Sequence, residues 1–112
     1  MIELRWKIWL EKDGAAIFGD GRAALLEAIE RTGSLSAAAR ELQIPYRSAW
    51  KHVNHMERAY GKKILDRRTG GATGGGCRLT DAGQRLLHGY LKFREGIDEL
   101  LSERFRRFVD TA

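Results

Sequence analysis

GSLSAAARELQIPYRSAWKHVNHME, residues 33–57, is the stretch that decides the fold. Ser34 or Ser36 suits the N-cap of a short helix. Its apolar side chains share one side, at Leu35, Ala38, Ala39 and Leu42. Gln43-Ile44-Pro45 forms a tight connection, and proline favours the first position of the next helix. A short helix, a tight turn and a second helix together predict a helix-turn-helix. The small side chains of Ala38 and Ala39 allow the neighbouring helix to approach closely.

The second helix, predicted from Pro45 to Tyr60, divides into an apolar stripe and a polar face. Residues at steps of three and four form a stripe that we expect to be buried: Tyr46, Ala49, Trp50, Val53, Met56 and Tyr60. The polar face carries Arg47, Ser48, Lys51, His52, Asn54, His55 and Arg58. In a helix-turn-helix the second helix enters the DNA major groove, where Arg and Lys match guanine and Asn matches adenine. We therefore predict that this face and Tyr46 contact DNA, and an ordinary amphipathic surface helix is the alternative.

A glycine-rich segment follows this helix between two short apolar runs. Ile64-Leu65 begins one strand, RRTGGATGGG (67–76) turns it, and Cys77-Arg78-Leu79 returns. A helix-turn-helix followed by such a ribbon is a winged helix. Glycines let backbone amides approach phosphates closely, so phosphate contacts are predicted here, at Thr69, Gly70, Gly71 and Thr73. A nucleotide-binding P-loop is excluded. Gly70 and Gly75 have the spacing of that motif, but Gly76-Cys77 stands where the motif requires Lys-Ser/Thr. A wing tip without any contact remains open.

Positive charge is concentrated in one segment. Residues 40–68 hold eight basic and three acidic side chains, whereas the formal net charge of the whole chain is +5. Such a local excess attracts polyanions, although a solvated charged face would look the same. The predicted contacts to the DNA backbone are Arg40, Arg58, Lys62, Lys63, Arg67 and Arg68, with Arg78 near the wing tip.

The N-terminal residues alternate between polar and apolar side chains. Residues 2–10 therefore predict a strand, Asp13-Gly14 predicts a hairpin turn, and residues 15–18 predict the returning strand. Asp20 is expected to cap a helix that runs to about Thr32 and ends at Gly33.

A long helix is predicted at the other end, from the cap Thr80 to about Phe108. Its near-heptad apolar stripe is too long for this small domain to cover, so we expect the second half to pair two chains. Trp9 lies on the nominally wet face of the hairpin and joins the same surface. The predicted dimerisation residues are Trp9, Phe93, Ile97, Leu100, Leu101, Phe105 and Phe108.

These elements predict one mostly α domain with small β-structure over residues 1–112. A β-hairpin arm (1–18) precedes a winged helix-turn-helix (20–80) and a long dimerisation helix (81–108). No catalytic arrangement, cofactor loop or metal site is apparent, because His52 and His55 have no third ligand nearby and the only cysteine is Cys77. A redox role for Cys77 is an alternative. Neither a signal peptide nor a membrane-spanning run is present, which predicts a cytoplasmic protein.

Three segments carry a family resemblance: GSLSAAAREL, IPYRSAWKHVNHME and RRTGGATGGGCRLTDAGQRLL. Together they resemble the N-terminal DNA-binding domain of ModE-type molybdate-responsive transcription regulators, and more distantly the LysR-type helix-turn-helix. The resemblance implies a prokaryotic winged-helix homodimer that binds two-fold symmetric operator DNA. It also implies a recognition helix at Tyr46–Arg58 and a wing at Arg67–Leu79. Molybdate-sensing members carry a second, oxyanion-binding domain, and since the sequence stops at Ala112, molybdate binding is not expected.

The sequence therefore predicts a homodimeric, sequence-specific DNA-binding regulator that is not an enzyme. Two other functions stay open: a winged helix that binds proteins, and a sensor that binds a small ligand in a dimer crevice.

Overall fold

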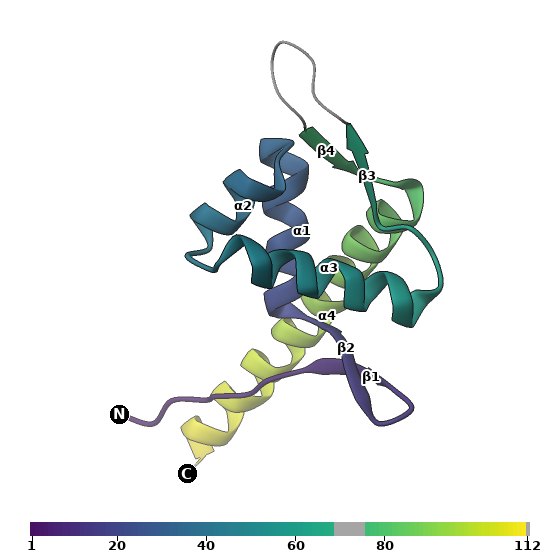
Figure 1. Cartoon of the computed structure of the whole chain (residues 1–112). Coiled ribbons are helices and arrows are strands. Elements are labelled where there is room, and N and C mark those ends of the chain that lie inside the picture. Colours follow the sequence, from purple (N-terminus) through teal and green to yellow (C-terminus); the bar gives the residue numbers. More distant parts are fainter. Residues whose placement is uncertain (69–75, 112) are drawn as a thin grey trace.

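The chain forms a winged helix-turn-helix with a β-hairpin at one end and a long helix that projects beyond the core. The computed structural model describes residues 1–68 and 76–111, except the side chain of Arg68. In chain order, the elements are β1 (Trp9–Lys12), β2 (Ala15–Gly19), α1 (Asp20–Thr32), α2 (Leu35–Glu41), α3 (Tyr46–Tyr60), β3 (Leu65–Arg68), β4 (Gly76–Leu79) and α4 (Asp81–Thr111). Figure 1 shows α3 crossing in front of α1, with the β3–β4 wing and the β1–β2 hairpin at opposite ends. The predicted fold class is confirmed.

The helix-turn-helix forms as its sequence predicts, with one small correction. The Ser34 hydroxyl accepts a hydrogen bond from the backbone N–H of Ala37 at 3.0 Å, which identifies Ser34 as the cap of α2. The turn uses Gln43 at a positive φ of 58°. Pro45 was predicted as the first residue of the next helix, but it stands one position earlier, as the N-cap of α3.

The core lies where α1, α2, α3, the wing and the first half of α4 meet. Leu26, Ile29, Val53, Met56 and Leu87 are fully buried there.

The expectation of a wholly buried α3 stripe was wrong at its edges. Tyr46 is 52% exposed, and Trp50 and Tyr60 are half-buried. Tyr46 lies in the first turn of α3, at one end of the helix rather than over the core.

The N-terminal strand is shorter than the alternating pattern predicted. Pairing begins at Trp9, which faces Gly19, and residues 1–8 form no strand. Since α1 begins at residue 20, no partner backbone remains for the residues before Trp9. The hairpin turn itself is confirmed, because Asp13 and Gly14 have φ values of 52° and 82°.

Asp20 was predicted to cap α1, and this was also wrong. Gly19 precedes the helix without any side-chain cap, and Asp20 is the first helical residue. Its carboxylate instead accepts hydrogen bonds from Tyr90 and from Arg94 Nε (2.9 Å) and Nη2 (2.8 Å). These contacts attach the start of α1 to the middle of α4.

The start of α4 is fixed against the base of the wing. The backbone N–H of Gly83 donates to Thr80 Oγ1 at 3.1 Å, which confirms Thr80 as the cap, and Thr80 Oγ1 donates to the carbonyl of Lys63 at 2.6 Å. The helix continues to Thr111, past the predicted end at Phe108. Of the helices in the described part, none is both long and apolar enough to cross a bilayer.

Candidate nucleic-acid interface

The outward face of α3 presents basic side chains that form no ion pair in the described part of the chain. The exposed residues on this face are the cations Arg47, Lys51 and Arg58 and the amide Asn54. Throughout residues 1–68 and 76–111, the ion pairs involve other side chains. The predicted polar face therefore exists as a surface, with Ser48, His52 and His55 half-buried at its margins.

Glu57, the single acidic residue of α3, turns away from this face. Its Oε2 accepts hydrogen bonds from the backbone N–H groups of Ile64 at 2.9 Å and Leu65 at 3.3 Å. Its Oε1 lies 4.0 Å from Lys63 Nζ. The carboxylate thus holds the start of β3 against α3 and places little negative charge on the outer face.

An aromatic and cationic stack joins the wing to α3. The Arg67 guanidinium lies 3.3 Å from the centroid of the Trp50 ring, and the Tyr46 and Trp50 rings meet edge to face at 6.2 Å. Arg67 is predicted to contact mainly the DNA backbone, and within the molecule it also connects β3 to the middle of α3. Sequence spacing could not reveal this contact, because the two residues belong to different elements.

A depression of about 540 Å³ lies at one side of α3. It is lined by Arg22, Lys51, His52, Asn54, His55 and Arg58. Arg22, from the first turn of α1, donates from Nη1 to the carbonyl of Ile17 at 2.6 Å, and its Nη2 lies 2.8 Å from Nδ1 of His55. Nothing in the sequence pattern singled out Arg22, which is 33 residues away from His55 in the chain.

The protonation of His52 is affected by this surrounding. Burial of the ring is the main cause that lowers the pKa of His52 below its usual value. Neighbouring basic groups act in the same direction, in the order Arg22, His55 and Lys51. His52 is therefore mainly neutral at pH 7.

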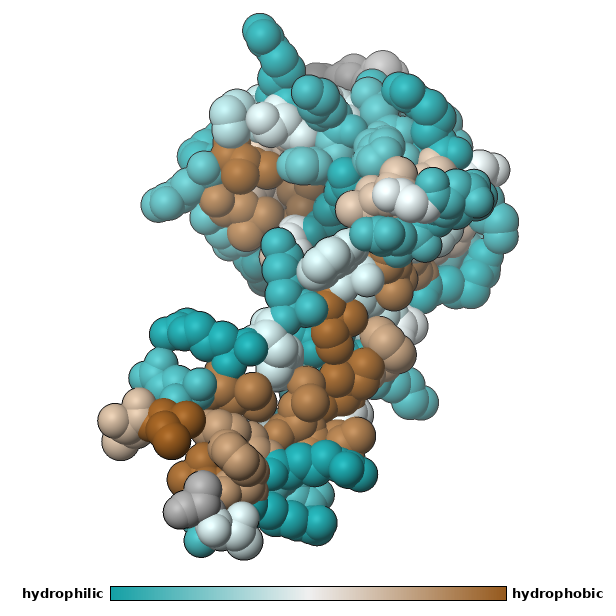
Figure 2. Space-filling model, turned by 90° about the horizontal axis from the view of Figure 1, so that it is seen from below, coloured by the Kyte–Doolittle hydropathy of each residue, from teal (hydrophilic) through white to brown (hydrophobic). Residues whose placement is uncertain are grey.

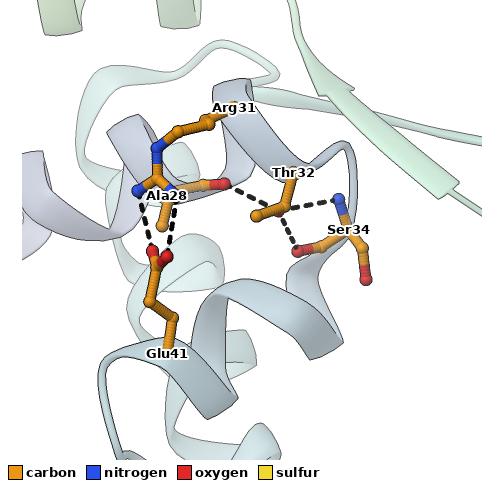
Figure 3. A network of polar contacts seen from close by, with 5 residues as sticks. All are labelled: Ala28, Arg31, Thr32, Ser34 and Glu41. Carbon is orange, nitrogen blue, oxygen red and sulfur yellow. Dashed lines mark hydrogen bonds and ion pairs between the residues drawn. The ribbon is translucent and has the colours of Figure 1, made fainter.

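Arg40 lies exposed on the last turn of α2, beside a carboxylate that is already neutralised. Arg31 donates two parallel hydrogen bonds to Glu41, both of 2.7 Å, and so joins α1 to α2 (Figure 3). Beside this pair, Thr32 Oγ1 donates to the carbonyl of Ala28 at 2.6 Å and stabilises the turn between the two helices. The Arg40 side chain is therefore exposed to solvent beside a carboxylate that is paired with Arg31.

The predicted wing residues are only partly described. Lys62, Lys63, Arg67 and Arg78 are exposed around the base of the wing. The backbone of Arg68 pairs with Gly76. Four predicted phosphate contacts lie outside the described residues: Thr69, Gly70, Gly71 and Thr73. Cys77 is buried in β4, and burial raises the pKa of its thiol, which makes the thiol less reactive.

The predicted dimerisation surface is only partly covered. Phe93, Leu100 and Phe108 are 49%, 49% and 62% exposed, and Trp9 is 49% exposed. Ile97, Leu101 and Phe105 are half-buried. The N-terminal arm approaches α4 here, since the Arg94 guanidinium lies 4.5 Å from the Trp6 ring centroid. Seen from below, apolar residues gather along the narrow projecting part of the molecule (Figure 2).

Residues 22–84 match the family of bacterial regulatory helix-turn-helix proteins of the lysR type. The molybdenum-pterin-binding protein MopB of Rhodobacter capsulatus is 44% identical over 93 residues, which are 83% of this chain and 34% of the relative. The DNA-binding transcriptional dual regulator ModE of Escherichia coli K12 is 41% identical over 75 residues, or 66% of this chain and 29% of the relative. This chain thus spans about a third of the length of these curated relatives.

Solved structures share the fold. ArgP from Mycobacterium tuberculosis superposes with a TM-score of 0.58 at 26% identity, over 75% of this chain and 30% of ArgP. A CbnR_DBD–DNA complex superposes with a TM-score of 0.61 at 22% identity, over 77% of this chain and 92% of that chain.

Proposed function

The chain belongs to the bacterial regulatory helix-turn-helix proteins of the lysR family, and on this premise we propose that it binds double-stranded DNA sequence-specifically as a transcription regulator. The observation that carries the proposal is the outer face of α3, where Arg47, Lys51 and Arg58 are exposed and Glu57 is directed to the wing. Such a helix enters the major groove and reads base edges from its first turns. The relatives' names, among them a DNA-binding regulator, support the same function.

The contacts divide into two kinds. Arg47, Ser48, Lys51 and Asn54 are proposed to meet bases or nearby phosphates. Cations around the wing base and the turn are proposed to bind the sugar-phosphate backbone, at Arg40, Lys62, Lys63 and Arg78. Backbone contacts position the protein without reading sequence, so the two groups differ in what their loss should do.

Substitution of Arg47 tests the base-reading role. Arg47→Ala should relax preference at one operator position, at a cost of about 1–3 kcal/mol for the preferred base. The matched control is Arg106→Ala, which removes the same charge from an exposed site near the far end of α4. Fluorescence anisotropy against a randomised duplex library, at several salt concentrations, measures both effects. If Arg47→Ala leaves the base preference as unchanged as Arg106→Ala does, the base-reading role of Arg47 is refuted.

We further propose that two copies pair through α4 beyond Tyr90 and the N-terminal arm. Phe93, Leu100 and Phe108 form an apolar surface of a kind that monomers rarely leave exposed. A pair would place two recognition helices about one DNA turn apart, roughly 34–36 Å, in adjacent major grooves. Light scattering at micromolar concentration should show a dimer for the native chain and a monomer for Leu100→Glu. A native monomer would remove this proposal and leave DNA binding by single copies.

A further inference from the structure

We propose that Arg22, His52 and His55 form a phosphate-binding depression beside the recognition helix, and that His52 takes up a proton when a phosphate enters. Duplex binding would then strengthen as the pH falls. This inference rests on the proposed DNA-binding function and adds to it a residue outside the helix-turn-helix and a pH dependence.

The lining of the depression has the composition of an anion site. Arg22 comes from α1, and the other five side chains come from successive turns of α3. All six are basic or amide groups, and no carboxylate lines this depression in the described part of the chain. An anion entering it would meet positive charge on two sides.

Arg22 is fixed in place before any ligand arrives. The carbonyl of Ile17 accepts from its Nη1, and Nδ1 of His55 accepts from its Nη2. That second hydrogen bond requires His55 to carry its proton on Nε2, which leaves Nε2–H as a further donor. A guanidinium has five N–H donors, so three remain for a phosphate, which Arg binds through parallel hydrogen bonds. A guanidinium held in this way loses little conformational entropy on binding.

The depression also disfavours the charged form of His52 while no anion is bound. The charged or titratable groups that face its ring are Arg22 from α1 and Lys51 and His55 from α3. With burial, they lower the pKa of His52. A phosphate would supply the missing negative charge and raise that pKa, so binding and proton uptake favour each other. This coupling is reciprocal, and the affinity for duplex therefore increases as the solution becomes more acidic.

The pH dependence of duplex affinity tests the proton uptake. Anisotropy titrations at pH 7.5, 6.75 and 6.0, at constant ionic strength, should show affinity rising by up to about tenfold per pH unit for one proton. His52→Gln should remove this rise. His88→Gln is the matched control, because His88, on α4, pairs with Glu30 and lies outside the depression. A pH-independent native chain, or a rise that survives in His52→Gln, overturns the proposal.

A direct titration of the His52 ring does not depend on any variant folding. Nuclear magnetic resonance can follow the ring with no ligand, with inorganic phosphate and with duplex DNA. A pKa raised by duplex alone assigns the depression to backbone phosphates, and a pKa raised by both ligands shows that free phosphate also binds. A pKa that neither raises overturns the proposal. If the chain binds no duplex at any pH but phosphate raises the pKa of His52, the phosphate-binding depression is supported and the proposed DNA-binding function is refuted.

Discussion

Gly83→Ala should destabilise the protein, although alanine is the better helix former. Gly83 is in the first turn of α4, where an added Cβ would lie 2.5 Å from the carbonyl oxygen of Ile64. The obstacle is backbone, so no change of rotamer relieves it. The same oxygen accepts from the backbone N–H of Thr80 at 2.9 Å and from Thr80 Oγ1 at 3.3 Å. Any shift that makes room for the methyl group therefore also strains the cap of α4.

The size of the destabilisation follows from one favourable and two unfavourable contributions. Alanine gains about 1 kcal/mol over glycine inside a helix. Overpacking costs about 1–3 kcal/mol, and each weakened hydrogen bond costs about 0.5–1.5 kcal/mol. With both hydrogen bonds to the Ile64 carbonyl weakened, the net loss should be about 1–5 kcal/mol in the free energy of unfolding. For a domain of this size that lowers Tm by roughly 4 °C or more per kcal/mol.

The same helix supplies the controls. A Cβ at Gly89 or at Gly96 would meet nothing within 4 Å, so alanine there should raise the free energy of unfolding by up to about 1 kcal/mol. Urea unfolding followed by circular dichroism compares the three variants. If Gly83→Ala proves as stable as Gly89→Ala, the close approach of α4 to the wing base is not real.

Three further substitutions test other contacts. Arg67→Lys keeps the charge but loses the planar stack on Trp50, so unfolding free energy should fall by about 0.5–1 kcal/mol; an unchanged urea midpoint contradicts the stack. Hydrogen bonding to Arg94 lowers the pKa of Asp20 from 3.8 to about 2, so its contribution is present above pH 4 and is lost as the pH falls towards 2. Because Asp20 is largely exposed, that contribution to stability is about 1 kcal/mol or less. Asp20→Asn should therefore lower the free energy of unfolding by this amount at pH 6 but not at pH 2. Urea midpoints at the two pH values measure the difference. Ser34→Ala should cost about 1 kcal/mol through the lost cap, and thermal unfolding measures it.

Local patterns predicted the fold well because the physics behind them is local. The cap at Ser34, the hairpin turn at Asp13-Gly14 and the spacing of α3 each depend on a few consecutive residues. The N-terminal strand failed because a strand needs a partner, and Gly19 is the last residue available to pair. Alternation alone carries no information about where the partner strand ends.

The sequence did not predict the parts of the candidate site that depend on residues far apart in the chain. Arg22 approaches His55, and Arg67 covers Trp50, only after α1 and the wing have packed against α3. Both arginines were visible as charges, but their neighbours were not. Asp20 was assigned to a cap for the same reason, since its partners on α4 lie 70 and 74 residues further along the chain.

The internal use of carboxylates explains how a chain of modest net charge presents a strongly cationic face. Glu41 is neutralised by Arg31, Glu57 holds the start of the wing, and Asp20 is held by Arg94. Each of these acids thus fixes a junction between elements and is at the same time prevented from opposing the cations of α3. Glu57→Gln should therefore loosen the wing more than it changes the charge of the face. Its effect on duplex affinity should therefore be a loss, although the substitution removes a negative charge, whereas simple electrostatics predicts a gain.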